Sequence, residues 1–421
     1  MFILYNILLT LAAPFWVPWM WFRARARKER PIWSERFGNY DLKPRKDNKR
    51  VWIHAVSVGE VVASIPILQE LKKELPDHEI VLSVTTSSGH QTAREKAAAL
   101  YDVLVYFPID VPRFQLAAVQ HVQPAAVAVM ETELWMNFLW AAKVFDVRTL
   151  LINGRISDRS FPRSMRVRRF YRSLLARMDR CLMQTEKDAD RIRALGAVQA
   201  EALGNCKFDQ ALSGLDADPS EWRAKLRLEP ALLTIVVGST RGEMEEQLVL
   251  DAIAEIGLDT IQIVHAPRHM ERVDALAEEV RRRFGTVALR SRGESGRYLI
   301  LDTYGELDKV YSVADVVIVG GGFDDLGGQN LLQPLAHGKP VLHGSHMQNF
   351  REVADAAVWQ GASAVCESRS ELALRLRELI GDPEKRKAMG DAARRLIQAN
   401  AGASKRYAKA IAEEARTFRR A

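Results

Sequence analysis

The segment VWIHAVSVGEVVASIPILQEL (residues 51–71) changes from the pattern of a β-strand to that of an α-helix within a few residues. Residues 51–56 are apolar and largely β-branched, whereas the apolar residues after Gly59 recur at helical spacing. In an open parallel sheet, turns of this kind line the ligand crevice, and the helix N-terminus favours negative charge. Glu60 in this turn is therefore either a functional residue or only a first-turn acid that offsets the helix dipole.

Short apolar runs alternate with helical patterns along the rest of the chain, which predicts an α/β fold with parallel sheets. The pattern stops at residues 213–230, which we interpret as a linker, and then starts again. We therefore expect two doubly wound, Rossmann-like domains that face each other across a cleft, over residues 51–212 and 231–421, the second ending in a charged helical segment. The runs are EIVLSV, VLVY, AAVAVM, TLLING and RCLMQ in the first domain and LTIVV, IQIVH, YLILD, DVVIV, PVLH and SAVC in the second.

The N-terminus has the composition of a membrane anchor. Residues 1–22 contain no charged side chain and would span about 33 Å as a helix, enough for a bilayer core of roughly 30 Å. Residues 23–50 form a basic juxtamembrane segment with eleven Lys or Arg and four acids, which would hold the protein at the cytoplasmic face. We expect a membrane anchor helix. The alternatives are a kinked interfacial helix, because of Pro14 and Pro18, and a helix buried in the fold.

The amino-acid composition limits the classes of protein to which the chain can belong. The 421 residues are 48% hydrophobic and 27% charged, which is ordinary for a globular protein with two cores. The three cysteines are far apart and fit neither a disulfide framework nor a metal site, which favours a reducing cytoplasm. Residues 163–180 hold seven Arg and one Asp, which suit phosphate or an anionic membrane, but no nucleic-acid motif accompanies them.

Two further turns of the first domain carry polar side chains after a predicted strand. Glu131 and Glu133 follow AAVAVM, and if this turn meets Glu60, neighbouring carboxylates raise one another's pKa and supply a base. Thr85 and Thr86 follow EIVLSV and suit a sugar or phosphate. Helix capping is the structural alternative for Glu133 and for one of the hydroxyls.

The second domain carries a glycine-rich turn at residues 319–330. It resembles a dinucleotide fingerprint, but Asp325 stands in place of the third glycine, so we exclude NAD and FAD. The backbone N–H groups of this turn still suit a phosphate. His265 and His269 do not predict a metal site, because Pro267 breaks the helix that would align them. Other predicted strand ends carry residues of the kind that bind a phosphate or a sugar: Ser239, Thr240 and Arg268.

Seven motifs, in their order along the chain, resemble the Kdo transferases, which add 3-deoxy-D-manno-octulosonic acid (Kdo) to a lipid A precursor. They are WIHAVSVGE, METELWMN, LINGRISDRSF, GNCKFD, GST, PRH, and GG followed by GGQNLLQPLAHGKPVLHG, over about residues 5–400. The resemblance implies a GT-B glycosyltransferase of lipopolysaccharide core biosynthesis, with an N-terminal acceptor domain and a C-terminal CMP-Kdo domain. It also implies an inverting mechanism that needs neither a metal nor another cofactor.

The same resemblance implies roles for individual residues. Glu60 would be the general base that takes the proton from a sugar hydroxyl of the acceptor, lipid IVA, while CMP departs from Kdo. The implied partners are CMP-Kdo, the lipid A precursor and the anionic surface of the inner membrane. The acceptor site would comprise Ser57, Gly59, Thr85, Thr86, Glu131, Glu133 and Arg155. The donor site would comprise Lys207, Ser239, Thr240, Pro267, Arg268, Gly321, Gly322, Gly328, Gln329, Asn330 and Gln333.

Two residues depart from the family's pattern, which has His before the Asn of the glycine-rich loop and Glu three residues after it. Here these positions are Gln329 and Gln333, and an amide binds a ribose without the charge of a carboxylate. A GT-B enzyme with another nucleotide sugar, such as a UDP-linked one, is therefore one alternative. A catalytically silent, membrane-bound lipid-binding protein is the other, and the intact Glu60 argues against it.

Overall fold

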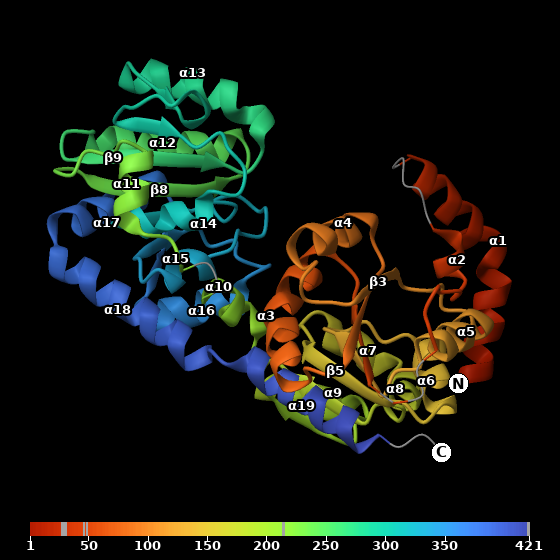
Figure 1. The fold of residues 1–421 in the computed structure, drawn as a ribbon. Coiled ribbons are helices and arrows are strands. Elements are labelled where there is room, and N and C mark those ends of the chain that lie inside the picture. Colours follow the sequence, from red (N-terminus) through yellow and green to blue (C-terminus); the bar gives the residue numbers. More distant parts are fainter. Residues whose placement is uncertain (27–31, 45–46, 48, 213–214, 419–421) are drawn as a thin grey trace. The chain divides into compact units, whose positions relative to one another are not determined.

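The computed structural model describes residues 1–26, 32–44, 47, 49–212 and 215–418. It divides into an N-terminal unit, Met1–Gln210 with Ala401–Ala421, and a C-terminal unit, Ala211–Asn400. Each unit contains one seven-stranded sheet flanked by helices (Figure 1), and every strand pair in both sheets is parallel. The prediction of two α/β domains with parallel sheets is therefore confirmed.

The sheet of the N-terminal unit has the strand order β3-β2-β1-β4-β5-β6-β7. Strand order reverses between β1 and β4, and in open α/β sheets the ligand crevice lies at such a switch point. The strands are β1 (Arg50–Ala55), β2 (Glu79–Val84), β3 (Val103–Tyr106), β4 (Ala126–Met130), β5 (Arg148–Gly154), β6 (Arg180–Met183) and β7 (Ala200–Ala202). The helices are α1 (Phe2–Ala26), α2 (Trp33–Arg36), α3 (Val58–Glu74), α4 (Ser87–Lys96), α5 (Pro112–Val122), α6 (Met136–Val144), α7 (Ser160–Arg166), α8 (Arg168–Leu175), α9 (Glu186–Leu195), α10 (Cys206–Leu212) and α19 (Ala403–Thr417).

The sheet of the C-terminal unit has the order β10-β11-β9-β8-β12-β13-β14, so its switch point lies between β8 and β12. Its strands are β8 (Leu233–Thr240), β9 (Ile261–Pro267), β10 (Ala288–Leu289), β11 (Tyr298–Ile300), β12 (Val316–Val319), β13 (Val341–His343) and β14 (Ser363–Val365). Its helices are α11 (Pro219–Lys225), α12 (Glu243–Ile256), α13 (Val273–Phe284), α14 (Leu307–Val310), α15 (Leu332–Ala336), α16 (Arg351–Trp359), α17 (Arg369–Gly381) and α18 (Pro383–Asn400), with 3₁₀ turns at Met270–Arg272, Arg290–Arg292 and Tyr311–Val313.

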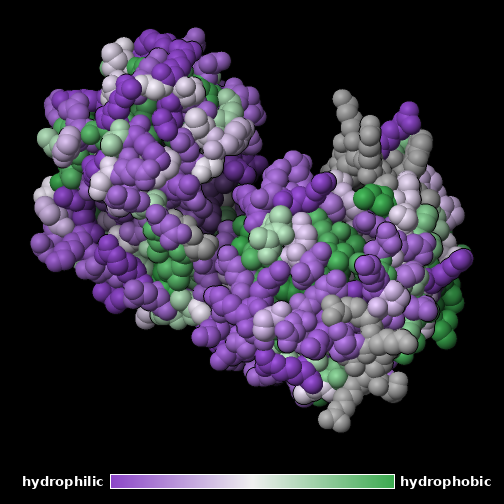
Figure 2. Space-filling model, in the orientation of Figure 1, coloured by the Kyte–Doolittle hydropathy of each residue, from purple (hydrophilic) through white to green (hydrophobic). Residues whose placement is uncertain are grey.

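The cores follow from the continuous apolar runs of the strands. All six residues of β1 are buried, as expected for a central parallel strand covered by helices on both faces. One face packs with α3 and α19, and the opposite face packs around Trp52 and Phe138. The largely hydrophilic surface of the C-terminal unit (Figure 2) is consistent with a core in which Ile235, Ile263 and Ile318 are fully buried. Both switch points therefore rest on rigid strands.

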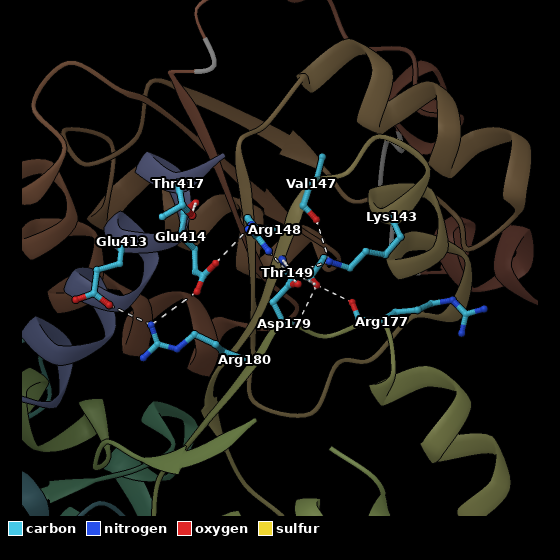
Figure 3. A network of polar contacts seen from close by, with 10 residues as sticks. All are labelled: Lys143, Val147, Arg148, Thr149, Arg177, Asp179, Arg180, Glu413, Glu414 and Thr417. Atoms are coloured by element: carbon cyan, nitrogen blue, oxygen red, sulfur yellow. Dashed lines mark hydrogen bonds and ion pairs between the residues drawn. The ribbon is translucent and has the colours of Figure 1, made fainter. Parts of the chain in front are cut away.

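The final helix, α19, belongs to the N-terminal unit, whereas the sequence analysis placed residues 231–421 in one domain. Its apolar face, with Tyr407 and Ile411, is buried in the core shared with α3. On its polar face, Glu414 pairs with Arg148 at 3.6 Å, and Glu413 pairs with Arg180 at 3.1 Å (Figure 3). These partners lie more than 200 residues away in sequence, so the charged pattern of α19 did not reveal them.

The expected membrane-spanning helix at residues 1–22 is not found, and this part of the prediction is wrong. Within the described residues, no helix is long and apolar enough to cross a membrane. The start of α1 instead makes polar contacts with its own unit. The Tyr5 hydroxyl donates to Asp110 at 2.8 Å, and the amides of Asn6 and Asn137 exchange hydrogen bonds of 2.8 and 2.9 Å. Of the basic segment at residues 23–50, residues 27–31, 45–46 and 48 lie outside the described part.

Candidate active site

Glu60 lies in the first turn of α3, just after the end of β1. Its carboxylate accepts hydrogen bonds from the backbone N–H of Val56 at 2.8 Å and from the hydroxyl of Ser57 at 3.1 Å. The Ser57 hydroxyl in turn accepts from the backbone N–H of Glu60 at 3.5 Å. This arrangement is a variant of the capping box that the sequence S-x-x-E encodes, in which the carboxylate accepts from the N–H of Val56, one residue before the N-cap Ser57. Glu60 therefore stabilises the start of α3 whatever else it does.

The surroundings of Glu60 also change the pKa of its carboxyl. The residue is only 8% exposed, and burial raises the pKa of its carboxyl to about 7. The hydrogen bond from Val56 lowers this pKa, whereas the neighbouring charges of Glu131 and Glu133 raise it. A carboxylate with a pKa near neutrality is well suited to act as a general base at physiological pH.

Glu131 and Glu133 follow β4, the strand that forms the switch point with β1. Glu131 adopts a left-handed backbone conformation, with φ of 54°, which is uncommon for a residue other than glycine and is often found at functional sites. Burial raises the pKa of Glu133, and the charge of Glu131 raises it further. The structure therefore brings Glu60 into electrostatic contact with both acids, as the sequence analysis expected.

Lys207 provides a cation beside these acids that sequence reasoning did not anticipate. Its ammonium lies 3.4 Å from the Glu131 carboxylate, in the N-terminal unit, although the resemblance assigned it to the donor site. Lys207 comes from α10, more than 70 residues after Glu131, so no local pattern joins the two. The N-terminal site consequently contains three carboxylates and at least one compensating charge.

The two hydroxyls after β2 differ: that of Thr86 serves the backbone, whereas the buried hydroxyl of Thr85 has no hydrogen-bond partner among the described residues. Thr86 caps α4, accepting from the N–H of Gly89 at 3.1 Å and donating to the carbonyl of Val56 at 3.2 Å. The carbonyl of Thr85 accepts from Arg36 at 2.6 Å, and Arg36 also donates to the carbonyl of Phe107 at 3.0 Å. Arg36 thus ties together the ends of β2 and β3. Sequence reasoning missed it because it stood among the many cations of the N-terminal basic segment.

Arg155 and Glu131 line one pocket of about 380 Å³, together with the hydroxyl residues Ser157, Ser160 and Ser164. Its apolar lining includes Leu134, Leu175 and Ile192. Gly59, also predicted for the acceptor site, lies in the first turn of α3 beside Glu60. The N-terminal unit therefore combines a buried base with a polar pocket that begins at the adjacent strand end.

In the C-terminal unit, the strand ends around the switch point are tightly joined. The Thr240 hydroxyl lies 2.9 Å from Nε2 of His265, and the carbonyl of Thr240 accepts from the N–H of Arg268 at 2.9 Å. Ser239, at φ of 60°, presses against the end of β12, where a Cβ on Gly320 would come within 2.6 Å of the Ser239 carbonyl oxygen. Pro267 ends β9 next to Arg268. These contacts bring Ser239, Thr240 and Arg268 to one edge of the sheet.

The glycine-rich loop after β12 is folded back on itself. The N–H of Gly328 donates to the carbonyl of Gly321 at 2.7 Å, and the N–H of Gln329 donates to the carbonyl of Gly320 at 3.1 Å. The side chain of Met347 lies under this loop, where a Cβ on Gly322 or Gly328 would come within 2.8 Å of its sulfur. A methyl group at either position would displace this flexible side chain, and Gly328, at φ of 77°, also has a backbone conformation that favours glycine.

Asn330 and Gln333 lie where this loop enters α15. The Asn330 side chain accepts from the N–H of Leu332 at 3.0 Å, and Gln333 is within the helix. Glu245 is a further residue that sequence reasoning missed. It is 1% exposed and accepts from the N–H groups of Arg241 at 2.6 Å and Phe323 at 3.2 Å, so it joins the loops after β8 and β12. The sequence signal that could have identified Glu245 was the position of this acid in the first turn of the helix α12.

The architecture of this chain is also found in solved structures of other proteins. The chain is similar to UDP-GlcNAc 2-epimerase from Neisseria meningitidis bound to UDP-GlcNAc, with a TM-score of 0.60 and 12% identity over 87% of this chain and 99% of that one. It is also similar to MurG from Acinetobacter baumannii, with a TM-score of 0.55 and 13% identity over the same shares. Identities this low show the fold alone. The two parallel-sheet units therefore have a GT-B-like fold.

A family model for 3-deoxy-D-manno-octulosonic-acid transferase (kdotransferase) matches residues 32–210, and one for glycosyl transferases group 1 matches residues 298–396. The 3-deoxy-D-manno-octulosonic acid transferase of Bordetella pertussis is 33% identical over 93% of this chain and 95% of that protein. The enzyme of that name from Haemophilus influenzae is 27% identical over 89% of each. The chain belongs to the 3-deoxy-D-manno-octulosonic acid (Kdo) transferase family, which confirms the resemblance.

Proposed function

We propose that this protein transfers Kdo from CMP-Kdo to a sugar hydroxyl of the lipid A precursor lipid IVA, with inversion and without a metal, in lipopolysaccharide core biosynthesis. Glu60 takes the proton of the acceptor hydroxyl as its oxygen attacks the anomeric carbon of Kdo and the bond to CMP breaks. The observation that carries this proposal is the position of Glu60 at the switch point, with its pKa raised to about 7 beside Glu131 and Glu133.

The N-terminal unit would bind the acceptor. Glu131, Glu133 and Arg155 offer charged hydrogen-bonding groups at neighbouring strand ends, and Lys207 joins this set through its ion pair with Glu131. Ser57, Gly59 and Thr86 would contribute mainly by fixing the backbone around the base, and the hydroxyl of Thr85, which has no partner among the described residues, would serve the acceptor. An acceptor carried by a lipid would place the reaction at the cytoplasmic face of the inner membrane, with the anionic lipid surface as a further partner.

The C-terminal unit would bind the donor. Arg268 and the backbone N–H groups of the glycine-rich loop would stabilise the charge that develops on the departing phosphate of CMP. Ser239, Thr240 and Pro267 would shape the floor of this site. Gln329, Asn330 and Gln333 would face the nucleotide as neutral side chains, so ribose recognition would rely on amide hydrogen bonds. Gly321, Gly322 and Gly328 would allow the backbone to approach the ligand closely.

The test is transfer by the purified protein from CMP-Kdo, generated in situ, to tetra-acylated lipid IVA, followed by mass spectrometry of the product. The expected result is a product heavier by Kdo that appears only with CMP-Kdo. Parallel reactions with UDP-linked sugars test the alternative donor that Gln329 and Gln333 suggest. Transfer from a UDP-sugar instead of CMP-Kdo would overturn the donor assignment. Binding of CMP without any transfer would instead support a catalytically silent protein.

A further inference from the structure

A basic groove runs along α7 in the N-terminal unit and begins beside Glu131. The pocket of about 380 Å³ beside Glu131 and Arg155 shares Ser157 and Ser160 with a second hollow of about 500 Å³. Because they share lining residues, the two hollows are continuous. We call this feature the α7 groove and define it by Glu131, Arg155, Ser157, Arg159, Ser160 and Arg163.

The loop that forms the groove is held firmly by α9. The backbone N–H of Ile156 donates to Asp188 at 2.7 Å, and the carbonyl of Ile156 accepts from Arg191 at 2.6 Å. Asp188 is 2% exposed, so this anchor lies inside the unit. The groove is consequently a built feature of the fold, with a fixed backbone beneath its polar side chains.

The charges of the groove are mostly uncompensated. Asp158, the acid of the same loop, is paired with Arg191 and Lys187, and these cations hold the pKa of its carboxyl at about 2. Glu131 faces the ammonium of Lys207. Among the residues that the structure describes, neither Arg159 nor Arg163 has an acidic partner. Arg159 and Arg163 therefore present their guanidinium groups to a ligand without a paired carboxylate.

This combination of groups selects for a particular ligand chemistry. Guanidinium groups bind phosphate oxygens through paired, charge-assisted hydrogen bonds. The hydroxyls of Ser157 and Ser160 already donate within the loop, at 2.9 and 3.1 Å, so the two arginines carry the interaction with the ligand. The first hollow also has an apolar lining that includes Leu134, Leu175 and Ile192, which suits a phosphate attached to a larger body. Glu131 both lines the groove and acts electrostatically on Glu60, so the groove begins close to the base.

We propose that the α7 groove binds a phosphate monoester carried by the acceptor saccharide, with Arg159 and Arg163 as its principal cations. This inference rests on the proposed function, because it takes a sugar hydroxyl of the same acceptor to be at Glu60. The groove then sets which hydroxyl reaches the base, by holding the acceptor at a second point. An unphosphorylated acceptor would bind weakly and in more than one orientation.

The test measures binding of a deacylated glucosamine disaccharide with and without its phosphate groups, by calorimetry and without any donor. Wild-type protein is expected to bind the phosphorylated form on the order of 10- to 100-fold more tightly. In the variant Arg159→Gln with Arg163→Gln, this preference is expected to fall to near one. The matched control, Arg166→Gln with Arg169→Gln, removes the same charge from neighbouring exposed positions outside the groove and is expected to keep the preference.

If both double variants lost the preference for the phosphorylated disaccharide equally, the effect would come from the overall positive charge and the proposal would be overturned. A groove variant that kept this preference would also overturn it. Binding to vesicles of phosphatidylglycerol is measured in parallel to separate the two sources of phosphate. A groove variant that loses vesicle binding but keeps the saccharide preference would show a membrane contact and also overturn the proposal. Because no donor is present, a phosphate preference in a protein that fails to transfer Kdo would contradict the proposed function while supporting the groove.

Discussion

The carboxylate of Glu60 accepts a hydrogen bond of 2.8 Å from the backbone N–H of Val56, four residues earlier in the chain. The C-terminal unit repeats this relationship, since Glu245 accepts from the N–H of Arg241 at 2.6 Å. Each acid begins the helix that follows the strand at the switch point of its sheet. Glu245 also accepts from the N–H of Phe323 and joins two loops, whereas Glu60 is surrounded by further carboxylates. The same cap therefore joins two loops in one unit and borders two further acids in the other.

The pH dependence of transfer is expected to follow the ionisation of Glu60. A general base acts in its deprotonated form, so kcat/KM for the acceptor should rise about tenfold per pH unit at low pH and level off above about pH 7. A glutamate with an ordinary pKa would level off near pH 4.5 instead. Initial rates between about pH 5 and 9 at saturating donor check this expectation, and a flat profile down to about pH 5 would contradict it.

Substitution of Glu131 by Gln is expected to move that profile to lower pH. The negative charge of Glu131 raises the pKa of Glu60, so its removal lets Glu60 ionise more easily. The ratio of activity at about pH 6 to activity at about pH 8 should rise by roughly two- to threefold, whatever happens to the absolute rate. The control is Lys207→Gln, which removes the partner of Glu131 but leaves its charge in place. A ratio that stays the same or falls in Glu131→Gln would argue against electrostatic coupling of the two acids.

The close contact between β8 and β12 predicts the effect of Gly320→Ala. The new methyl group would come within 2.6 Å of backbone atoms of Ser239 and Thr240, which cannot move aside as a flexible side chain would. We expect a loss of unfolding free energy of about 1–3 kcal/mol and a higher KM for the nucleotide donor. Gly381→Ala is the control. Outside the helix and the chain neighbours of Gly381, no atom of the described residues lies within 4 Å of the position of the new methyl group. The unfolding free energy of this control variant should therefore change by less than about 0.5 kcal/mol. Urea unfolding and donor titration measure both quantities.

The docking of α19 depends on Asp209. Its carboxylate accepts from the backbone N–H groups of Gly402 at 2.5 Å and Ser404 at 2.7 Å, where α19 begins. Asp209→Ala leaves both donors without their acceptor and should lower the unfolding free energy by about 1–3 kcal/mol. Asp216→Ala removes an acid of the linker and should have an effect within about 0.5 kcal/mol. Equal stability of the two variants in urea would mean that Asp209 does not hold α19.

Much of the fold could be predicted because parallel strands between helices are long apolar runs. Every run identified in the sequence became a strand, whereas β7 and β10 were missed because they contain only three and two residues. The arginine-rich composition of residues 163–180 did not reveal that Val167 separates α7 from α8. Local sequence patterns thus predict that a long helix or strand exists better than they predict where it begins and ends.

The parts of the site that could not be predicted depend on contacts between distant segments. The capping box at Glu60 is local, and so is the acidic turn at Glu131, and both could be predicted from the sequence. Lys207 reaches Glu131 from a helix far along the chain, and Arg36 reaches the carbonyl of Thr85 from the basic segment. For the N-terminal residues, apolar composition suggested a membrane span, but the polar contacts of Tyr5 with its own unit were invisible in the pattern.

The most direct test of the account is the rate of Kdo transfer by wild type and by Glu60→Gln at about pH 8, where the base is deprotonated, with equal concentrations of folded protein. Gln at this position preserves the side-chain volume and can still complete the capping box, so the fold and CMP binding should be retained. Loss of a general base predicts a rate lower by about 10²- to 10⁴-fold. A variant that transfers Kdo at the wild-type rate would reduce Glu60 to a helix cap and contradict its role as the base.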